Sequence, residues 1–483
     1  MKKMLLVCLL PATLLSHMSH AQDKWDLRRC VEYALANNIS IKQADVQARL
    51  ARLTLSQSKL NQVPTLAVGS GLGINSGNSL NPTNYTVVNQ TVLYNNFSLQ
   101  SNVTVFNGFN LQNVIVANRY AWQSSLAITE RTKNDVSLNV ANAYLQVLLT
   151  NEQTRAAHAK LELSQSQLEI TRKQVRAGTL PELNAAELES QVAQDSSNYI
   201  NLQGTTQLNI YTLKAYMGLD AGAAFDVATP PVEQIPVENL IDVQPEAVYA
   251  LALTNQPQQK ADAFQIESSR HFVKANKGAM YPQVSLGGSL GTNFNTTALP
   301  GYYSVTSPLP SPISIGYVEG SNTRVLVDSF SKTFQTESHT PYFKQLSSYF
   351  SQSIGINVSI PILNNGVLRT NYARSKLNLR NAELQRDQDN LTLKNNIYQA
   401  YTAASTALQK YEANKISLAA TLKSADYARK RYGVGMLNTI DLLTNENNYF
   451  NAQINLLSSQ YDYVFKMKVL EFYKGLGIKL TKD

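Results

Sequence analysis

Side chains that could do chemistry are few in this chain, and they are dispersed along it. The histidines and methionines beyond residue 21 lie far apart in sequence: His158, His271, His339, Met217, Met280, Met436 and Met467. No phosphate-binding loop, zinc-ligand spacing or nucleophile motif is present. The sequence therefore predicts that the protein is not an enzyme and that it uses no cofactor and no metal ion.

Charge patterning argues against a nucleic-acid partner. Lysine and arginine exceed aspartate and glutamate by 42 to 34, but charged residues make up only 16% of the chain. The positive excess is spread along predicted helices and forms no basic cluster, so no nucleic-acid binding is expected.

Residues 1–21 have the composition of a signal peptide for secretion. Lys2 and Lys3 precede an apolar stretch from Leu5 to Leu15, which is too short to cross a bilayer, and small residues surround a cleavage site after Ala21. Once the signal is removed, Cys30 is the only cysteine, so no internal disulfide can form. Its place in an apolar helical pattern predicts a buried thiol.

The chain contains an internal duplication. In the later part of each copy, equivalent residues such as Gly178 and Gly435 are 257 apart (435 − 178 = 257). Near the start of each copy, pairs such as Pro64 and Pro282 are 218 apart (282 − 64 = 218). The difference of 39 residues (257 − 218 = 39) indicates one insertion in the second copy, near 292–350.

These offsets divide the chain into a first structural repeat at 22–219, a linker at 220–245 and a second repeat at 246–483. The linker is rich in proline and has little periodicity, so we expect it to be extended. Each repeat is predicted to run helix, strand, strand, very long helix, tight turn and medium helix.

Two segments of each repeat alternate apolar and polar residues, as strands with one apolar face do. The apolar positions are Leu66, Val68, Leu72, Ile74, Phe97, Leu99, Val103, Val105, Val284, Leu286, Leu290, Phe294, Ile354, Ile356, Val358 and Ile360. Glycine, serine, asparagine and glutamine stand between them. We therefore expect four strands of about ten residues, a length that crosses a membrane at a tilt.

Two stretches of the chain, at about 110–177 and 367–432, contain no proline and little glycine. Each is predicted to be a single helix of about 65 residues, on the order of 100 Å long. Shorter helices are expected at 27–61 and 180–218, and together they match one long helix in length. Apolar residues from Ile440 to Val464 recur three and four residues apart, which is coiled-coil spacing.

A four-stranded sheet cannot close on itself, and an open edge in lipid would leave backbone groups unpaired. Either these strands lie outside a membrane, or several chains share one barrel. Three chains would supply twelve strands, enough to enclose a water-filled lumen lined by the polar faces. The predicted fold class is thus an α+β membrane protein in which a long α-helical coiled-coil barrel continues a shared 12-stranded trimeric β-barrel.

The two helix–helix turns, at 175–184 and 432–441, resemble the helical tip of the TolC family of outer-membrane efflux proteins. The opening segment from Trp25 to Leu35 and the strand exit Phe106-Asn107-Gly108 also match this family. With four strands in a duplicated chain, the resemblance covers nearly the whole mature sequence. The first turn departs from the family pattern, because valine and asparagine replace its Tyr and Asp and a proline is added.

The resemblance implies a homotrimeric, passive exit duct in the cell outer membrane, in contact with lipid, with its helical part in the periplasm. Such ducts dock a periplasmic adaptor (membrane fusion) protein, which links them to an inner-membrane pump of the RND, ABC or MFS type. The duct would serve a tripartite efflux pump or a type I secretion system. The alternative is a secreted coiled-coil scaffold or adhesin without a pore, which would not need strands with lipid-like alternation.

In the family, the helical tips are the docking sites. The corresponding residues here are Gly178, Thr179, Leu180, Gly435, Met436 and Leu437. Both glycines could instead be helix C-caps and nothing more. Opening the duct would require closed tips to slide apart.

Several polar and aromatic positions have two interpretations. Asp441 could cap the returning helix or stay solvated, or it could face the pore mouth in a ring of charge. Asn447 could hold the register of the apolar seam or lie on its solvated flank. The tyrosines in or beside the insertion could lie at the lipid headgroups or belong to an outer loop without lipid contact: Tyr302, Tyr303, Tyr317, Tyr342 and Tyr349.

Overall fold

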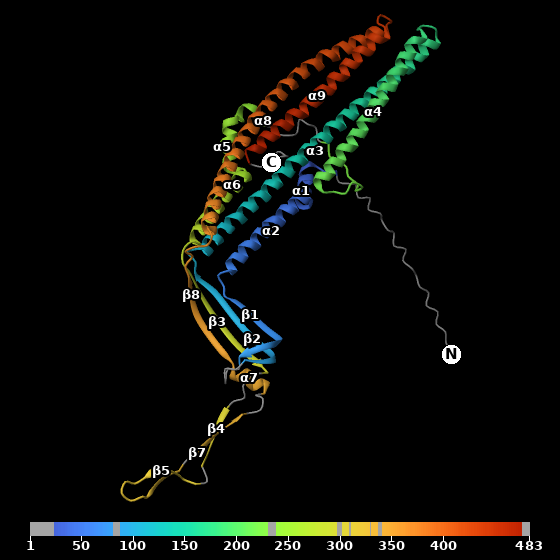
Figure 1. Cartoon of the computed structure of the whole chain (residues 1–483). Coiled ribbons are helices and arrows are strands. Elements are labelled where there is room, and N and C mark those ends of the chain that lie inside the picture. Colours follow the sequence, from blue (N-terminus) through green and yellow to red (C-terminus); the bar gives the residue numbers. More distant parts are fainter. Residues whose placement is uncertain are drawn as a thin grey trace, which may run out of the picture. The chain divides into compact units, whose positions relative to one another are not determined.

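The computed structural model describes residues 24–80, 87–229, 238–296, 302–308, 311–328, 330–336 and 341–475 (Figure 1). The expected signal peptide and residues 230–237 of the expected linker lie outside these ranges. The chain forms two compact units, and each draws on both repeats. We call Met1–Leu53, Asn118–Ser269 and Asn378–Asp483 the helical unit, and Thr54–Ala117 with Arg270–Leu377 the sheet unit. None of the described helices is both long enough and apolar enough to cross a membrane.

The long helices form where proline is absent. Helix α3 spans Asn110–Arg176 and α8 spans Val367–Gly433, with 67 residues each, close to the predicted bounds. The chain returns in α4 (Glu182–Met217) and α9 (Thr439–Tyr473). Among the residues of α9 with the predicted coiled-coil spacing, Phe450, Tyr461 and Val464 are buried, whereas Ile440 is exposed.

The expectation of one unbroken helix at 27–61 is wrong. The chain forms α1 (Leu27–Asn37) and α2 (Ile39–Leu60), because Asn38 between them is extended. Its side-chain oxygen accepts the Ser40 N–H at 2.8 Å, and its Nδ2 donates to the carbonyl of Tyr216 at 2.7 Å. The short helix α1 and the end of α4 therefore meet at Asn38.

The second repeat is broken at the equivalent place. Helices α5 (Pro245–Asn255) and α6 (Pro257–Gly278) flank Gln256. Its Nε2 donates to the carbonyls of Phe472 and Tyr473 at 3.0 and 3.1 Å. Both repeats thus use a side-chain amide at the helix break to bind carbonyls at the end of the returning helix.

Two apolar cores occupy equivalent positions in the helical unit. One contains Cys30, Ala34 and Leu213, and the other contains Val248, Ala252 and Leu470. The first two pairs are 218 apart (248 − 30 = 218) and the third is 257 apart (470 − 213 = 257), which are the two repeat offsets. The prediction that Cys30 is buried is confirmed, and burial raises the pKa of its thiol to about 12.

The segment expected to be an extended linker is partly structured. Val227 is buried in the first core and forms a parallel bridge with Trp25. A short 3-10 helix, η2, spans Leu240–Asp242 before α5 begins at Pro245. These contacts attach the described parts of the linker to the helical unit.

The sheet unit contains the four expected strands in one antiparallel sheet. Strands β1 (Thr65–Leu80), β2 (Val87–Phe106), β3 (Gln283–Asn295) and β8 (Ser351–Ser359) lie in the order β1-β2-β3-β8. The first two are longer than expected, at 16 and 20 residues, because their far ends pair as an extended ribbon.

The register places residues of one kind on each face of the sheet. On one face, Val68, Leu99 and Leu290 form a row across β1, β2 and β3. On the other face, Gly69, Ser98 and Gly291 form the adjacent row. The pairing of β2 with β3 is irregular near the end of β2. A bulge between Thr104 and Phe106 leaves Val105 without a partner in the register and brings Phe106 opposite Val284.

The insertion of the second repeat forms structure that the sequence did not predict. Strands β4 (Tyr302–Pro308) and β7 (Phe330–Thr336) form one antiparallel ribbon, and β5 (Ile313–Tyr317) and β6 (Arg324–Val327) form another. Helix α7 (Tyr342–Ser348) then leads into β8. The side chains of Tyr302 and Tyr303 lie outside the described part of the chain, and Tyr317 is exposed.

Candidate functional site

The candidate site consists of the two turns that join the long helices to their returning partners. Gly178 and Gly435 have φ angles of 74° and 75°. In the first turn the Gly178 N–H donates to Val175 at 2.9 Å and the Thr179 N–H donates to Gln174 at 3.0 Å. The second turn repeats this pattern at 3.0 and 2.8 Å. Both turns are therefore Schellman caps, in which a left-handed residue closes the helix end.

The residues predicted to dock a partner differ in exposure. Gly178, Thr179, Gly435 and Met436 are exposed, whereas the leucines that follow, Leu180 and Leu437, are half-buried. Met436 is 71% exposed. A Cβ built on either glycine would meet nothing within 4 Å, so only the backbone angle demands glycine. Sequence reasoning did not include three exposed apolar residues near these turns: Leu183, Val434 and Ile440.

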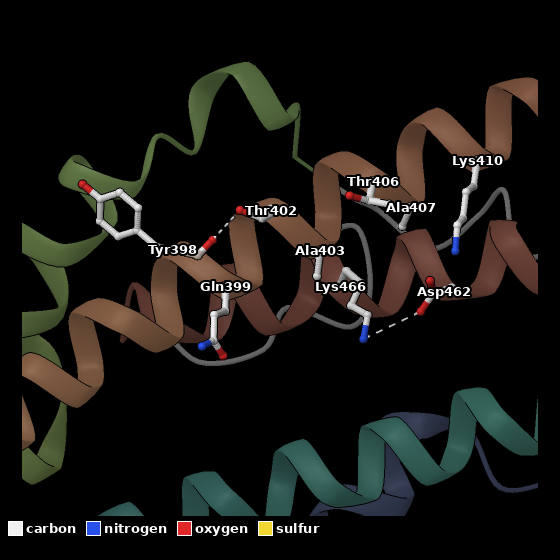
Figure 2. A pocket seen from close by; sticks show the side chains of 9 residues that line it. All are labelled: Tyr398, Gln399, Thr402, Ala403, Thr406, Ala407, Lys410, Asp462 and Lys466. Carbon is white, nitrogen blue, oxygen red and sulfur yellow. Dashed lines mark hydrogen bonds and ion pairs between the residues drawn. The ribbon is translucent and has the colours of Figure 1, made fainter.

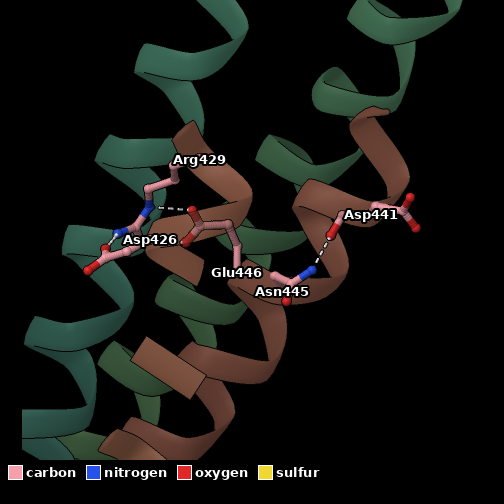
Figure 3. Close-up of polar contacts among 5 residues, drawn as sticks. All are labelled: Asp426, Arg429, Asp441, Asn445 and Glu446. Carbon is pink, nitrogen blue, oxygen red and sulfur yellow. Dashed lines mark hydrogen bonds and ion pairs between the residues drawn. The ribbon is translucent and has the colours of Figure 1, made fainter. Parts of the chain in front are cut away.

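The two returning helices begin differently. Asn438 caps α9, because its side-chain oxygen accepts the Asp441 N–H at 2.7 Å. The cap is thus Asn438 and not the Asp441 side chain, which is exposed in the first turn of α9, where a negative charge is favourable (Figure 3). Pro181 occupies the same position before α4 and makes no side-chain cap bond.

Each hairpin has an arginine–glutamate pair at the same place. Arg172 Nη2 lies 2.6 Å from Glu189 Oε1, and Arg429 donates from Nε and Nη2 to the two oxygens of Glu446 at 2.5 and 2.7 Å (Figure 3). The Glu189 side chain is 50% exposed but that of Glu446 only 8%. The hydrogen bonds to Glu446 raise the pKa of Arg429, and Asp426 adds a contact at 3.0 Å. The repeat offset pairs Arg172 with Arg429. The sequence around each arginine does not indicate that its partner is the glutamate 17 residues later.

A buried polar cluster connects the two hairpins below the turns. Lys160 Nζ lies 2.8 Å from Asp195 Oδ1 and donates to Asn447 Oδ1 at 2.6 Å. Ser164 and Gln191 donate to the Asp195 carboxylate at 2.6 and 2.9 Å. Asn447 on the apolar seam therefore binds side chains of the other hairpin, which favours a role in register.

The second repeat cannot form this cluster. The repeat offset places Ser417 at the position of Lys160 and Ala452 at the position of Asp195. Nearer the turns, Thr171 and Tyr432 join the hairpins through their hydroxyls at 3.3 Å. The family resemblance singled out Tyr432, which Val175 replaces in the first repeat.

Figure 2 shows an open groove of about 510 Å³ along α8 and α9. Its lining includes Thr402, Ala403 and Ala407, with Asp462 and Lys466 paired at 3.8 Å. Tyr398, Gln399 and Lys410 also line this groove (Figure 2). Among the described residues, no group of three or more His, Cys, Asp or Glu side chains could hold a metal ion.

The sheet presents a second functional surface. Its polar face forms a hollow of about 390 Å³, lined by small and amide side chains of all four strands: Thr65, Ala67, Gln100, Ser101, Asn102, Gly287, Gly288, Ser289 and Ser353. The opposite face exposes large apolar residues, with Val68 at 80% and Ile354 at 81%. A soluble protein rarely exposes such a face, so it requires an apolar surrounding.

Comparison with known proteins identifies the family. The sequence profile described as "Outer membrane efflux protein" matches residues 30–219 and 248–473. The chain belongs to the outer membrane efflux protein family. Its relatives include Toxin and drug export protein A of Aggregatibacter actinomycetemcomitans, 19% identical over 91% of this chain and 83% of that protein.

Solved structures show that the fold is that of the outer membrane efflux proteins. CusC, studied for conformational changes during folding and transmembrane channel formation, has a TM-score of 0.74 at 16% identity over 94% of this chain and 92% of its own. The Campylobacter jejuni CmeC outer membrane channel has a TM-score of 0.72 at 17% identity, over 95% and 87%. The predicted family and fold class are confirmed, and the family is that of outer-membrane exit ducts for efflux. The family and the fold are those of channels and not of enzymes, and nothing supports the scaffold or adhesin alternative.

Proposed function

We propose that three copies of this chain form one passive duct, with the sheets joined in a twelve-stranded barrel in the outer membrane. One observation supports this assembly above all: within the described sheet, β1 and β8 pair on one side only. Strand direction alternates from β1 to β8, so β8 of one copy can pair antiparallel with β1 of the next. Sharing strands in this way removes both open edges from the lipid.

The two faces of the sheet fit this assembly. The polar face, with its glycine, serine and asparagine side chains, would line a wet lumen, and the face with Val68 and Ile354 would contact lipid acyl chains. Transfer of one such side chain from water to hydrocarbon contributes about 1.5–3 kcal/mol. The exposed apolar face thus favours a membrane position for the sheet, and the helical unit would lie in the periplasm.

The helices also show faces that await neighbours. Leu391 and Ile416 on α8 are 63% and 73% exposed in the single chain. The groove of Figure 2 lies along the same helix, where small residues would admit a helix of another copy at short range. A hollow coiled-coil cylinder built from three helical units would cover these surfaces.

A disulfide test addresses the shared barrel. Val68→Cys on β1 and Ile356→Cys on β8 place one cysteine on each edge strand and on the same face. Oxidation of the double variant in the membrane should give covalent dimers and trimers on a denaturing gel. Each single variant serves as control, and buried Cys30 stays unreactive. Only monomers, across neighbouring positions of both strands, would contradict the assembly.

We further propose that the turns dock a periplasmic adaptor that connects the duct to an inner-membrane pump. The exposed caps at Gly178, Thr179, Gly435 and Met436 support this role, and the half-buried Leu180 and Leu437 would complete an apolar seat for a partner helix. Exposed Asp441 would lie at the edge of this surface, toward the pore mouth.

Photocrosslinking in cells tests the docking surface. A photoreactive residue at Leu180 or Leu437 should capture one adaptor of the tripartite system. The same residue at the exposed Ile241, far from both turns in sequence, is the matched control. Equal capture at Ile241, or none at either turn, would refute docking at the tips. The identity of the captured chain would assign the duct to an RND, ABC or MFS pump.

A further inference from the structure

Helix α7 lies at the end of the sheet that is remote from the connections to α3 and α8 (Figure 1). Strand β8 begins at Ser351, which pairs with Gly291, so β3 continues past β8 to Asn295. Along this extension α7 takes the place of a strand. Gln345, only 4% exposed, accepts the Asn295 N–H through its side-chain oxygen at 3.2 Å.

Helix α7 also covers the polar side chains on the apolar face of the sheet. The register places Asn95 and Thr292 on that face, beside Phe97 and Phe294. Thr292 Oγ1 donates to the Leu346 carbonyl at 2.5 Å, and Asn95 Nδ2 donates to the Tyr342 hydroxyl at 2.8 Å. The Asn95 amide nitrogen and the Thr292 hydroxyl, which would be costly against lipid, are thus hydrogen-bonded to α7.

Exposed aromatic rings lie on α7 and between α7 and β8. Phe343 on α7 is 80% exposed, and Phe350, which directly precedes β8, is 57% exposed. In β8, Ile354 and Ile356 lie on the apolar face of the sheet and are also exposed, so Phe350 adjoins the strand that carries this face. Exposed Lys344 and Ser347 lie beside the rings.

We infer that α7 is a lipid-contacting helix that lies in the outer-leaflet interface, with its Phe343 and the neighbouring Phe350 at the boundary between acyl chains and headgroups. This inference rests on the proposed barrel, whose lipid-facing surface it extends. A mixture of aromatic rings and polar groups on one short helix suits that boundary, where one side is apolar and the other wet. Continuity with the apolar sheet face favours lipid over a protein partner as the occupant.

Spin labelling of the full-length protein in phosphatidylcholine vesicles tests this inference. Three single substitutions provide the labels: Phe343→Cys on α7, Val68→Cys on the apolar face and Ser353→Cys on the polar face. Cys30 should stay unlabelled because it is fully buried. Collision rates with oxygen, which concentrates in lipid, and with a water-soluble nickel chelate report the surroundings of each label.

The expected result is that the label at Phe343 favours oxygen, as at Val68, but lies at shallower depth, while the label at Ser353 favours nickel. A preference for nickel at Phe343 with oxygen still favoured at Val68 would place α7 in water and overturn the inference alone. Weak collision with both reagents at Phe343 would mean that protein covers it, which also overturns the inference. A preference for nickel at Val68 would instead contradict the proposed barrel.

Discussion

Replacing Asp262 with asparagine should stabilise the helical unit at neutral pH and leave it unchanged in acid. Asp262 on α6 is buried, and Asp389 on α8 raises its pKa. Gln258 Nε2 donates to both carboxyl groups, at 2.9 and 3.0 Å, and Arg131 on α3 donates to the Gln258 side chain at 2.9 Å. Two carboxylates that share one donor repel each other, and protonation of one of them removes this repulsion.

The size and the sign of the effect follow from this geometry. Burial, and then the charge of Asp389, raise the pKa of Asp262 from 3.8 to about 6. Because the folded state holds this proton more tightly, its contribution is complete below pH 3.8 and is lost as the pH rises through about 6. A difference of about two pKa units corresponds to at most about 3 kcal/mol, and about 1–3 kcal/mol is expected after partial screening.

Asparagine cannot ionise, but its amide can still donate to Asp389. Thermal unfolding of the full-length protein, followed by circular dichroism, should therefore give a higher midpoint for Asp262→Asn than for the unmodified protein at about pH 8, and equal midpoints at about pH 4. The matched control is Asp387→Asn, an exposed aspartate on α8, the helix of Asp389.

Other groups near the pair also titrate. Asp135 on α3 has its pKa raised by burial, and this burial-driven shift persists in Asp262→Asn. Tyr473 on α9 has its pKa raised by burial and by Asp135, but it stays protonated over this pH range. An equal gain from Asp262→Asn at both pH values, or no gain at the higher one, would refute the assignment of the proton to this pair.

Three further perturbations probe the turns and the cluster beneath them. Gly435→Val forces a β-branched residue to a φ of 75°, which costs about 1–3 kcal/mol locally. Export, measured as drug tolerance, should fall while the trimer persists on gels. Normal drug tolerance in this variant would refute a docking role. Arg429→Ala leaves the buried Glu446 unpaired and should lower the free energy of unfolding by about 3 kcal/mol. Arg172→Ala breaks the exposed pair with Glu189 and should lower it by less than about 1 kcal/mol. Equal losses in the two variants would contradict this ranking. Lys160→Met leaves the buried Asp195 without its ion pair and should destabilise the protein by about 3 kcal/mol. Adding Asp195→Leu should restore most of this loss. A single variant Lys160→Met as stable as the unmodified protein would contradict this expectation.

Elements that depend on local pattern were predictable from the sequence. Helices α3 and α8 end within a residue or two of their expected bounds. No proline interrupts either stretch, so each continues as a single helix. The strands followed from alternation, and the register confirms which residues share a face. The bulge at Val105 was missed because it depends on pairing with β3 and not on the composition of β2.

Features that depend on distant partners could not be predicted in this way. The break at Asn38 is fixed by a bond to Tyr216, 178 residues later. The position of α7 depends on polar groups of β2 and β3 that look out of place until the helix covers them. The glycines of the turns were predictable from the sequence. The N-cap of α9 is Asn438 and not Asp441. A side chain at the N-cap position reaches the free N–H groups of the first turn, whereas a side chain three residues later does not.

The two hairpins differ in side chains that a docking partner could contact. Both hairpins end in the same backbone cap. In the second hairpin, Arg429 pairs with Glu446 of the same hairpin. In the first hairpin, Lys160 donates a hydrogen bond to Asn447 of the second. A threefold assembly would therefore present turns of two alternating kinds. An adaptor that binds only the backbone of the cap would occupy both kinds equally, so equal capture at Leu180 and Leu437 would indicate recognition of the turn itself. Capture at only one of them would show that side chains, which the duplication has allowed to diverge, select the seat.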